Sequence, residues 1–158
     1  MTPTENEGAA GLESAERRRI HETFRRAAFV NHLGIELDDF GAGWAETTLA
    51  VDPRLEQAEG IVHGGVQATL ADHTAGAAAM TLLPADRVVL TLEFKVNLLQ
   101  PARGGRLRCR AKVVKPGKSY VVVLAEVYCG PAGNDVLTSI ATVTMAVVPD
   151  PRLRAASA

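Results

Sequence analysis

The segment from about Val62 to Leu83 constrains the fold more than any other part of the sequence. It is the only long helical candidate in the middle of the chain, and its larger apolar residues are Val66, Leu70 and Met80. Alanine fills many of the other positions, namely Ala68, Ala71, Ala75, Ala77, Ala78 and Ala79. Small side chains let a sheet approach a helix closely from several sides. The segment therefore predicts a central helix wrapped by a curved sheet.

Strand-like segments lie on both sides of this helix. Residues 34–39 and 44–51 have the pattern of a hairpin, and a helix capped by Ser14 is predicted before them, at about 14–29. Four strand-like segments follow Pro84, at 87–100, 106–113, 119–129 and 136–148. Because short turns join them, we expect three or four of these strands to form an antiparallel meander. The predicted class is α+β, with one long helix inside a strongly curved sheet.

The length of 158 residues suits a single domain. The polar residues 1–12 predict a disordered tail, residues 13–148 the domain, and residues 149–158 a C-terminal tail. The sequence contains no internal repeat, and nothing in it indicates a second domain.

Composition argues against several classes of protein. The net charge is −1 and the aromatic residues are four Phe, one Trp and two Tyr, which disfavours a nucleic-acid partner. No apolar run approaches the ~18–20 residues of a membrane span. The first residues lack the pattern of a secretory signal, and Cys109 and Cys129 have no CxxC spacing. We therefore expect a cytoplasmic protein with reduced thiols and no membrane partner.

The residues His63-Gly64-Gly65, followed by Asp72, could carry chemistry. The two glycines open the central helix, where N–H groups lack intrahelical partners and the helix dipole adds positive charge. A bare backbone N–H at this point can bind a carbonyl oxygen that becomes tetrahedral. Asp72 lies two turns further along and can attack a carbonyl or take a proton from water. In the alternative interpretation, Asp72 lies on an exposed helix face and the two glycines only form a tight turn.

The stretch Gly60-Ile-Val-His-Gly-Gly-Val-Gln-Ala-Thr-Leu-Ala-Asp72 resembles the hotdog-fold acyl-CoA thioesterases of the phenylacetic-acid-degradation (PaaI-like) type. The resemblance extends upstream to Leu33-Gly34-Ile35 and to Gln57. Downstream it includes residues 91–102 and the Gly117-Lys118-Ser119 turn. It implies a long helix held in an antiparallel sheet, in agreement with the architecture predicted above.

The same resemblance implies hydrolysis of an acyl-CoA to a free acid and coenzyme A. Asp72 would be the nucleophile, or the general base for water, and the Gly64 N–H would polarise the thioester carbonyl. His63 would shape the turn. Gln57 would position substrate or water from the opposite subunit.

A hydroxyl group near the attacking water is a further expectation from the family. Thr91 lies where some members place it. Other members carry the hydroxyl one helical turn after the carboxylate, where this chain has Gly76.

Residues 101–118 form a basic stretch with seven bases and no acid. Such a stretch suits a small anionic ligand, and arginine pairs well with the phosphates of coenzyme A. The candidate contacts are Arg103, Arg106, Lys115 and Lys118, with Ser119 beside them. The alternative is that these bases are only the solvated face of a half-buried strand.

Two other functions stay open beside the thioesterase, an acyl-thioester hydratase or dehydratase and a non-catalytic acyl-CoA-binding module.

We expect no cofactor, since coenzyme A is part of the substrate, and no metal, since His63, Asp72 and His73 lack ligand spacing. A core or interface role is predicted for His73, because it points away from Asp72 on a helix. A sheet on one helix leaves edges open, so we expect a homodimer or homotetramer with active sites at the subunit interface.

Overall fold

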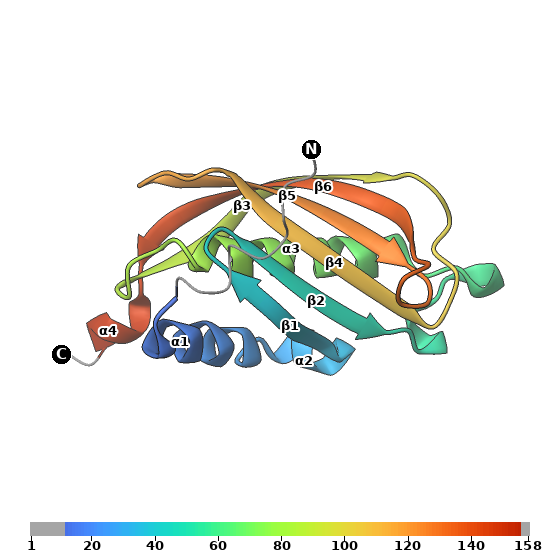
Figure 1. Cartoon of the computed structure of the whole chain (residues 1–158), viewed down its shortest axis with the longest axis horizontal. Helices are drawn as coiled ribbons and strands as arrows, with labels where there is room; N and C mark the ends of the chain where they lie inside the picture. The colour runs from blue at the N-terminus through green and yellow to red at the C-terminus, as the bar shows by residue number, and fades with distance from the viewer. Residues whose placement is uncertain (1–11, 156–158) are drawn as a thin grey trace.

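A six-stranded antiparallel sheet curls around the helix α3 (Figure 1). The computed structural model describes residues 12–155, so the predicted N-terminal tail lies outside the described residues except for Leu12. The strands are β1 (Ile35–Gly41), β2 (Trp44–Ala50), β3 (Arg87–Leu98), β4 (Arg106–Lys115), β5 (Tyr120–Cys129) and β6 (Val136–Pro149). The helices are α1 (Ser14–Arg25), α2 (Ala28–Leu33), α3 (Gly64–Met80) and α4 (Pro151–Ala155), with the short 3-10 helices η1 (Pro53–Leu55) and η2 (Ala58–Gly60) before α3. The predicted α+β class is confirmed. None of the helices within residues 12–155 has the length and apolarity that a membrane crossing needs.

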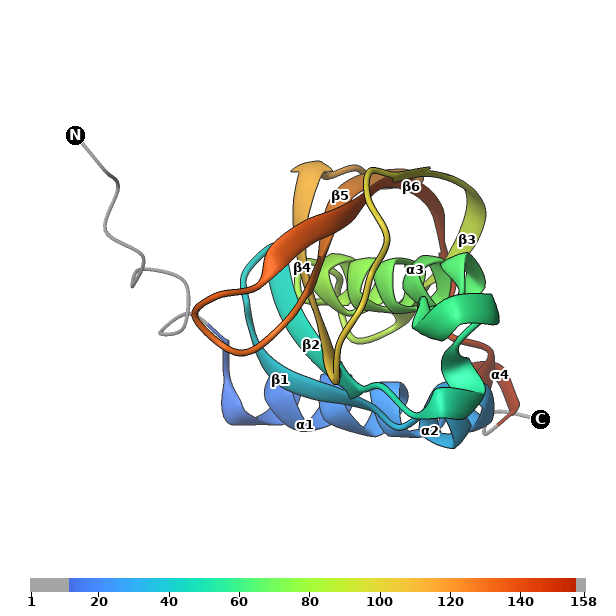
Figure 2. The ribbon, with the colours of Figure 1, turned by 90° about the vertical axis from the view of Figure 1, so that its right-hand side faces the viewer.

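The alanine-rich composition of α3 explains how the sheet encloses it. Ala71, Ala75, Ala78 and Ala79 have no exposed surface, and neither has Leu70. Helix α1 lies on the side of α3 that the sheet leaves open, as both ribbon views show (Figures 1 and 2). The central helix predicted from the sequence is therefore confirmed.

The N-terminal helix predicted over 14–29 is two helices in the structure. Helix α1 ends at Arg25, and α2 follows after a two-residue break. The Asn31 side chain donates a hydrogen bond to the Arg25 carbonyl (2.5 Å), which gives a carbonyl of the last turn a partner. The predicted cap is one residue off, because Glu13 is the N-cap and forms a capping box with Glu16.

Strand β3 departs from the predicted meander. Strands β4, β5 and β6 are neighbours as predicted, but β3 pairs with β6 and not with β4. Residues 99–105 lead from the end of β3 to β4, and the Leu99 N–H donates to the Thr138 carbonyl (2.9 Å) on the way. Strand β3 is therefore an edge strand, and Leu90, Leu92 and Leu98 on it are 60%, 57% and 58% exposed.

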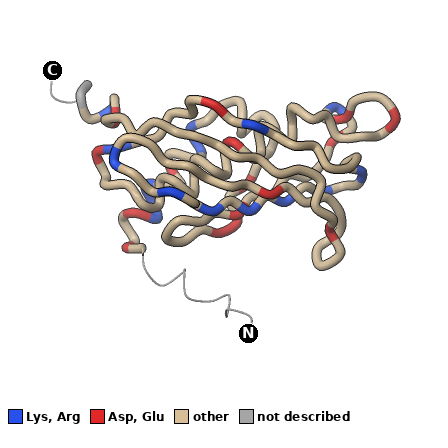
Figure 3. The backbone as a smooth tube through the Cα atoms, turned by 90° about the horizontal axis from the view of Figure 1, so that it is seen from above, with Lys and Arg blue, Asp and Glu red and all other residues tan. Residues whose placement is uncertain are grey.

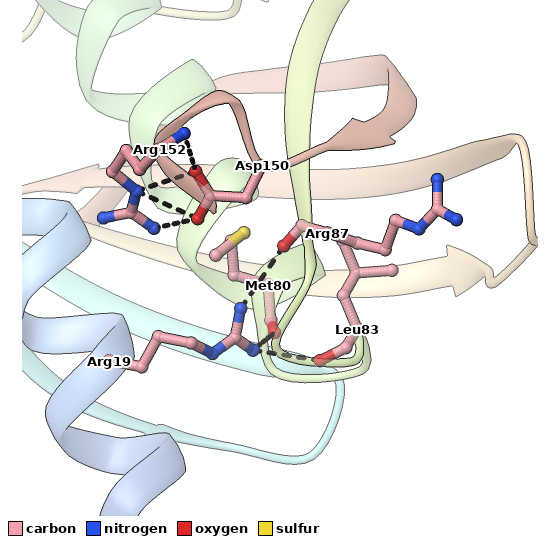
Figure 4. A network of polar contacts seen from close by, with 6 residues as sticks. All are labelled: Arg19, Met80, Leu83, Arg87, Asp150 and Arg152. Atoms are coloured by element: carbon pink, nitrogen blue, oxygen red, sulfur yellow. Dashed lines mark hydrogen bonds and ion pairs between the residues drawn. The ribbon is translucent and has the colours of Figure 1, made fainter. Parts of the chain in front are cut away.

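The predicted C-terminal tail contains regular structure, since β6 runs to Pro149 and α4 follows. Asp150 between them is buried. Its N–H donates to the Asp86 carbonyl (2.8 Å), and its carboxylate pairs with Arg152 (Figure 4). The hydrogen bonds from Arg152 lower the pKa of Asp150 to about 2.

Arg19 connects α1 by hydrogen bonds to the end of α3 and to the start of β3. Its guanidinium group donates hydrogen bonds to the carbonyls of Met80 (3.2 Å), Leu83 (2.9 Å) and Arg87 (3.3 Å), as Figure 4 shows. Because Met80 is the last residue of α3, the cation also meets the negative end of the helix dipole. Arg19 thus holds α1 against α3.

His73 is the residue of α3 on which Phe24 of α1 packs, with ring centroids 4.4 Å apart. Burial lowers the pKa of His73, although the charge of Asp72 and the backbone of Phe24 act in the opposite direction. The fold therefore favours the neutral imidazole. An unfolded histidine titrates near pH ~6.5. The stability that neutral His73 contributes is present above that pH and is lost as the pH falls toward the folded pKa.

Replacing Arg19 by alanine should lower the free energy of unfolding by about 2 kcal/mol, because three carbonyls lose a charged donor. Urea unfolding followed by circular dichroism measures this change. Arg18→Ala, at an exposed position of the same helix, is the matched control and should cost less than about 0.5 kcal/mol. Equal unfolding midpoints for the two variants would show that the Arg19 contacts do not hold α1.

Acidification from about pH 7.5 to about pH 5.5 should destabilise the wild type more than His73→Phe, which keeps a ring against Phe24 but cannot bind a proton. Urea midpoints at the two pH values give the comparison. His32→Phe changes an exposed histidine and should keep the wild-type pH dependence. A parallel loss of stability in the wild type and His73→Phe would contradict the prediction.

Candidate active site

The first turn of α3 presents a free backbone N–H. His63 caps the helix, since its Nδ1 accepts a hydrogen bond from the Gly65 N–H (2.9 Å) and its carbonyl accepts one from the Val66 N–H (2.9 Å). Among the described residues, the N–H of Gly64 has no such acceptor. His63 therefore shapes the turn, and Gly64 is left with a donor for a ligand.

A cavity of about 320 Å³ opens beside Gly64. Gln57 and residues 98–102 contribute to its lining, together with Gly64 and Gln67 from α3. A Cβ atom on residue 64 would lie 3.0 Å from Cδ1 of Leu98, so glycine lets β3 come close to the start of the helix. Gln57 is exposed.

Asp72 lines a second cavity, of about 160 Å³, between α1, α3 and the sheet. The Thr91 hydroxyl donates a hydrogen bond to Oδ1 of Asp72 (2.7 Å). The carboxylate residue is partly buried, and Ile20, Phe24 and Met145 add apolar surface to the wall of the cavity. Asp72 therefore lies half-buried at the wall of a cavity and not on a fully open helix face.

The wall of the Asp72 cavity also includes residues with unpaired polar atoms. Among the described residues, Oγ1 of Thr23 and Nε2 of His73 are buried without a hydrogen-bond partner. Gly76 lies on the same wall, where a Cβ atom would make an ordinary contact, 3.8 Å from Cε of Met145. Thr91 of β3 places its hydroxyl group in the same cavity, beside Asp72.

Asp72 and Gly64 lie in different cavities of one chain. Eight positions along α3 correspond to about 12 Å along a helix axis. Asp72 does not line the cavity beside Gly64, and neither Gly64 nor Gln57 lines the cavity beside Asp72. One chain therefore brings Asp72 together with Thr91, and Gly64 together with Gln57, but it keeps these two pairs apart.

The predicted coenzyme A contacts are also split. Arg106 begins β4 and Arg103 lies in the loop before it, where the Arg103 guanidinium donates to the Glu59 carbonyl, near Gln57. The remaining candidates lie at the other end of the strand or in the turn after it, namely Lys115, Lys118 and Ser119. Ten extended residues span about 33 Å. Figure 3 likewise shows Lys and Arg positions along the length of the molecule. One chain does not gather them into a single phosphate site.

Two other bases of β4 pair with acidic side chains. Arg108 contacts Asp135 (2.7 Å), and Arg110 contacts Glu46 of the neighbouring strand β2 (2.6 Å). For these two positions the solvated-face interpretation fits the structure.

Gln67 is a site residue that the sequence analysis missed. It is 3% exposed and lines the cavity beside Gly64. Positions three apart share one face of a helix, so a glutamine three residues after Gly64 in an alanine-rich helix was the available signal. The contribution of α1 to the Asp72 cavity depends on tertiary packing and had no comparable signal.

Within residues 12–155, no group of three or more His, Cys, Asp or Glu residues is placed to hold a metal ion. Cys109 and Cys129 are buried free thiols. Burial raises the pKa of Cys109 to about 12. The two thiols form no disulfide with each other in this structure.

Comparison with known proteins identifies the family. The thioesterase superfamily model matches residues 59–134. A thioesterase family protein from Silicibacter pomeroyi is 33% identical with a TM-score of 0.82, over 85% of this chain and 99% of that one. The 1,4-dihydroxy-2-naphthoyl-CoA hydrolase of Escherichia coli is 30% identical over 63% of this chain and 73% of its own length. The E. coli PaaI protein from the phenylacetic acid degradation operon shares the fold, at 19% identity and a TM-score of 0.75, over 84% of this chain and 93% of that one. The chain belongs to the thioesterase superfamily and has its hotdog fold.

Proposed function

We propose that the protein hydrolyses acyl-CoA thioesters to a free acid and coenzyme A. The hydrogen bond from Thr91 to Asp72 carries the proposal, because it fixes a carboxylate on the wall of a cavity that an acyl group can enter. Relatives from Listeria monocytogenes and E. coli, both named 1,4-dihydroxy-2-naphthoyl-CoA hydrolase, support a coenzyme A thioester as substrate. The volume of about 160 Å³ resembles that of an apolar cavity that binds benzene (about 150 Å³), so a compact acyl group fits.

A second copy of the chain completes the proposed site. Strand β3 has an unpaired edge, and exposed leucines lie along it. If two β3 strands pair antiparallel about a two-fold axis, the end that carries Leu98 lies opposite the half that carries Thr91 in the partner. Leu98 packs near Gly64, and Thr91 holds Asp72. Gly64 of one chain therefore approaches Asp72 of the other. We propose a homodimer, or a homotetramer of two such dimers, with two sites in each dimer.

The same pairing draws the proposed coenzyme A contacts together. The Ser119 carbonyl accepts a hydrogen bond from Val147, which pairs with Val89 of β3. The turn with Lys118 and Ser119 thus lies toward the end of β3 that the far end of the partner's strand approaches. Arg103 of one chain and the Lys115–Ser119 segment of the other are the proposed phosphate contacts.

In the proposed reaction, the thioester carbonyl binds the Gly64 N–H and Asp72 of the partner acts on it. As a nucleophile, the carboxylate forms a mixed anhydride while the C–S bond breaks, and water then cleaves the anhydride. As a general base, it takes a proton from a water molecule that attacks the carbonyl directly. Gln57 positions substrate or water in either route. An oxyanion donor such as the Gly64 N–H typically stabilises the transition state by about 2.7–4 kcal/mol.

Asp72→Asn should lower kcat for acyl-CoA hydrolysis at least ~100-fold, because an amide neither attacks a carbonyl nor takes a proton. Thiol release from a panel of acyl-CoAs measures kcat, and thermal melting checks the fold. Thr91→Ser, which keeps the hydroxyl, should retain more activity than Thr91→Val, which does not.

Near-normal turnover by Asp72→Asn would remove Asp72 from its proposed role. The absence of thiol release from every acyl-CoA by folded wild type would overturn the thioesterase. Binding without turnover would then favour the acyl-CoA-binding module, and a hydrated or dehydrated acyl-CoA would favour the hydratase or dehydratase.

Two inactive variants should complement each other if the site is shared between chains. Gly64→Pro removes the N–H, proline suits the first position of a helix, and the extended His63 (ψ 135°) suits the residue before proline. When Gly64→Pro and Asp72→Asn chains are unfolded and refolded together, half of the dimers are mixed and one of their two sites is intact. About a quarter of the wild-type activity should return.

Gly64→Ala is the control for this experiment, since it adds a Cβ atom next to Leu98 but keeps the N–H. Its activity should stay within about fivefold of the wild type. Removal of an oxyanion donor, by contrast, typically lowers activity about 100-fold or more. No recovery in the mixed sample would contradict the shared site.

A further inference from the structure

Gln67 is a buried polar side chain whose amide oxygen accepts a hydrogen bond and whose amide nitrogen donates none to the described residues. The Thr138 hydroxyl shares its single proton between Oε1 of Gln67 (2.9 Å) and the Val127 carbonyl (3.1 Å). Among residues 12–155, the amide nitrogen of Gln67 has no hydrogen-bond acceptor. Gln67 lines the cavity of about 320 Å³ at the start of α3. The carboxamide is therefore fixed through its oxygen and keeps its N–H donors for an occupant of that cavity.

Helix geometry places this amide near Gly64. Residues three apart lie on one face of a helix, and helical side chains lean toward the N-terminus. The side chain of Gln67 therefore covers the turn that begins at Gly64. Both residues line the same cavity, so their free donors share one space.

The side chain of Gln67 is almost wholly buried except where it meets the cavity. Gln67 is 3% exposed in a helix whose other buried positions are mostly alanine. Unlike Nε2 of His73, its amide nitrogen is not sealed from solvent, so it keeps surface open to the cavity that the residue lines. An acceptor atom in the cavity can therefore reach this nitrogen. Gln57, by contrast, is exposed.

We propose that Gln67 is a catalytic residue that donates a second hydrogen bond to the thioester carbonyl oxygen, beside the Gly64 N–H. This role rests on the proposed hydrolysis. A carbonyl oxygen has two lone pairs and can accept both bonds, and its negative charge in the tetrahedral state strengthens both. Gln67 forms no covalent bond and gives up no proton. Thr138 is a positioning residue, because its hydroxyl fixes the direction of the amide.

Gln67→Met tests the donor directly, since methionine has a similar length but no N–H. We expect kcat to fall about 100-fold and KM to stay within about threefold, because the bond to the carbonyl strengthens in the transition state. Stability should change little, since the Thr138 proton then goes wholly to Val127. Gln67→Glu keeps the shape but places a carboxylate at the developing charge, so kcat should fall at least as far.

Thr138→Val frees the amide and should lower kcat about tenfold at an unchanged KM, a split that a purely structural role would not produce. Thr142→Val makes the same change at an exposed position of β6 and should leave kcat unchanged. Wild-type kcat in Gln67→Met or in Gln67→Glu would overturn the role of Gln67, while hydrolysis by the wild type would leave the proposed function standing.

A binding measurement separates this inference from the proposed function. The side-chain amide signals of Gln67 in an NMR spectrum are assigned by their loss in Gln67→Met. An acyl-CoA ketone analogue, with a methylene group between the carbonyl and the sulfur, cannot be hydrolysed and should shift them. If the wild type hydrolyses no acyl-CoA, both the proposed function and the catalytic role of Gln67 are contradicted. In that case, a shift of the Gln67 amide signals by the analogue supports only carbonyl binding by Gln67. Unshifted signals in the presence of bound analogue overturn the role of Gln67 in every case.

Discussion

The close approach of a curved sheet to α3 is the constraint on which the rest of the structure depends. Ala71, Ala75 and Ala78 have no exposed surface, and larger side chains there would push the strands away from the helix. Gly64 extends the same close contact to the start of the helix, where a Cβ atom would press on Leu98. The small residues that pack the core thus also set the distance between β3 and the chemical groups of α3.

Helix geometry also explains why assembly is needed for the proposed chemistry. A free N–H at Gly64 and a carboxylate at Asp72 are held on one rigid helix, about 12 Å apart along its axis. A local side-chain movement does not close such a gap. An edge strand with exposed leucines, by contrast, can pair with the same strand of a second chain. Such pairing would bring Gly64 of one chain close to Asp72 of the other. The homodimer and the thioesterase activity are therefore one proposal, argued from the same strand.

Local patterns in the sequence were enough to predict most elements and the position of the glycine turn. The strand-like segment 106–113 predicted β4, and the alanine-rich segment predicted α3. The pairing of β3 with β6 was not predictable in this way, because it depends on how the sheet closes around the helix. Some of the bases between Arg103 and Lys118 were expected to contact the phosphates of coenzyme A, and the extended strand β4 separates these bases along its length. Gln67 was missed although its position three residues after Gly64 places it on the same face of the helix, since whether that face lines a cavity depends on tertiary packing.

The most direct test of the shared site is a crystal structure with the uncleavable ketone analogue of an acyl-CoA. The account predicts a carbonyl oxygen about 3 Å from the Gly64 nitrogen of one chain, with the carbonyl carbon facing Asp72 of the partner. A carbonyl group bound far from Asp72, or a monomer that holds the analogue with Gly64 and Asp72 of the same chain, would contradict it.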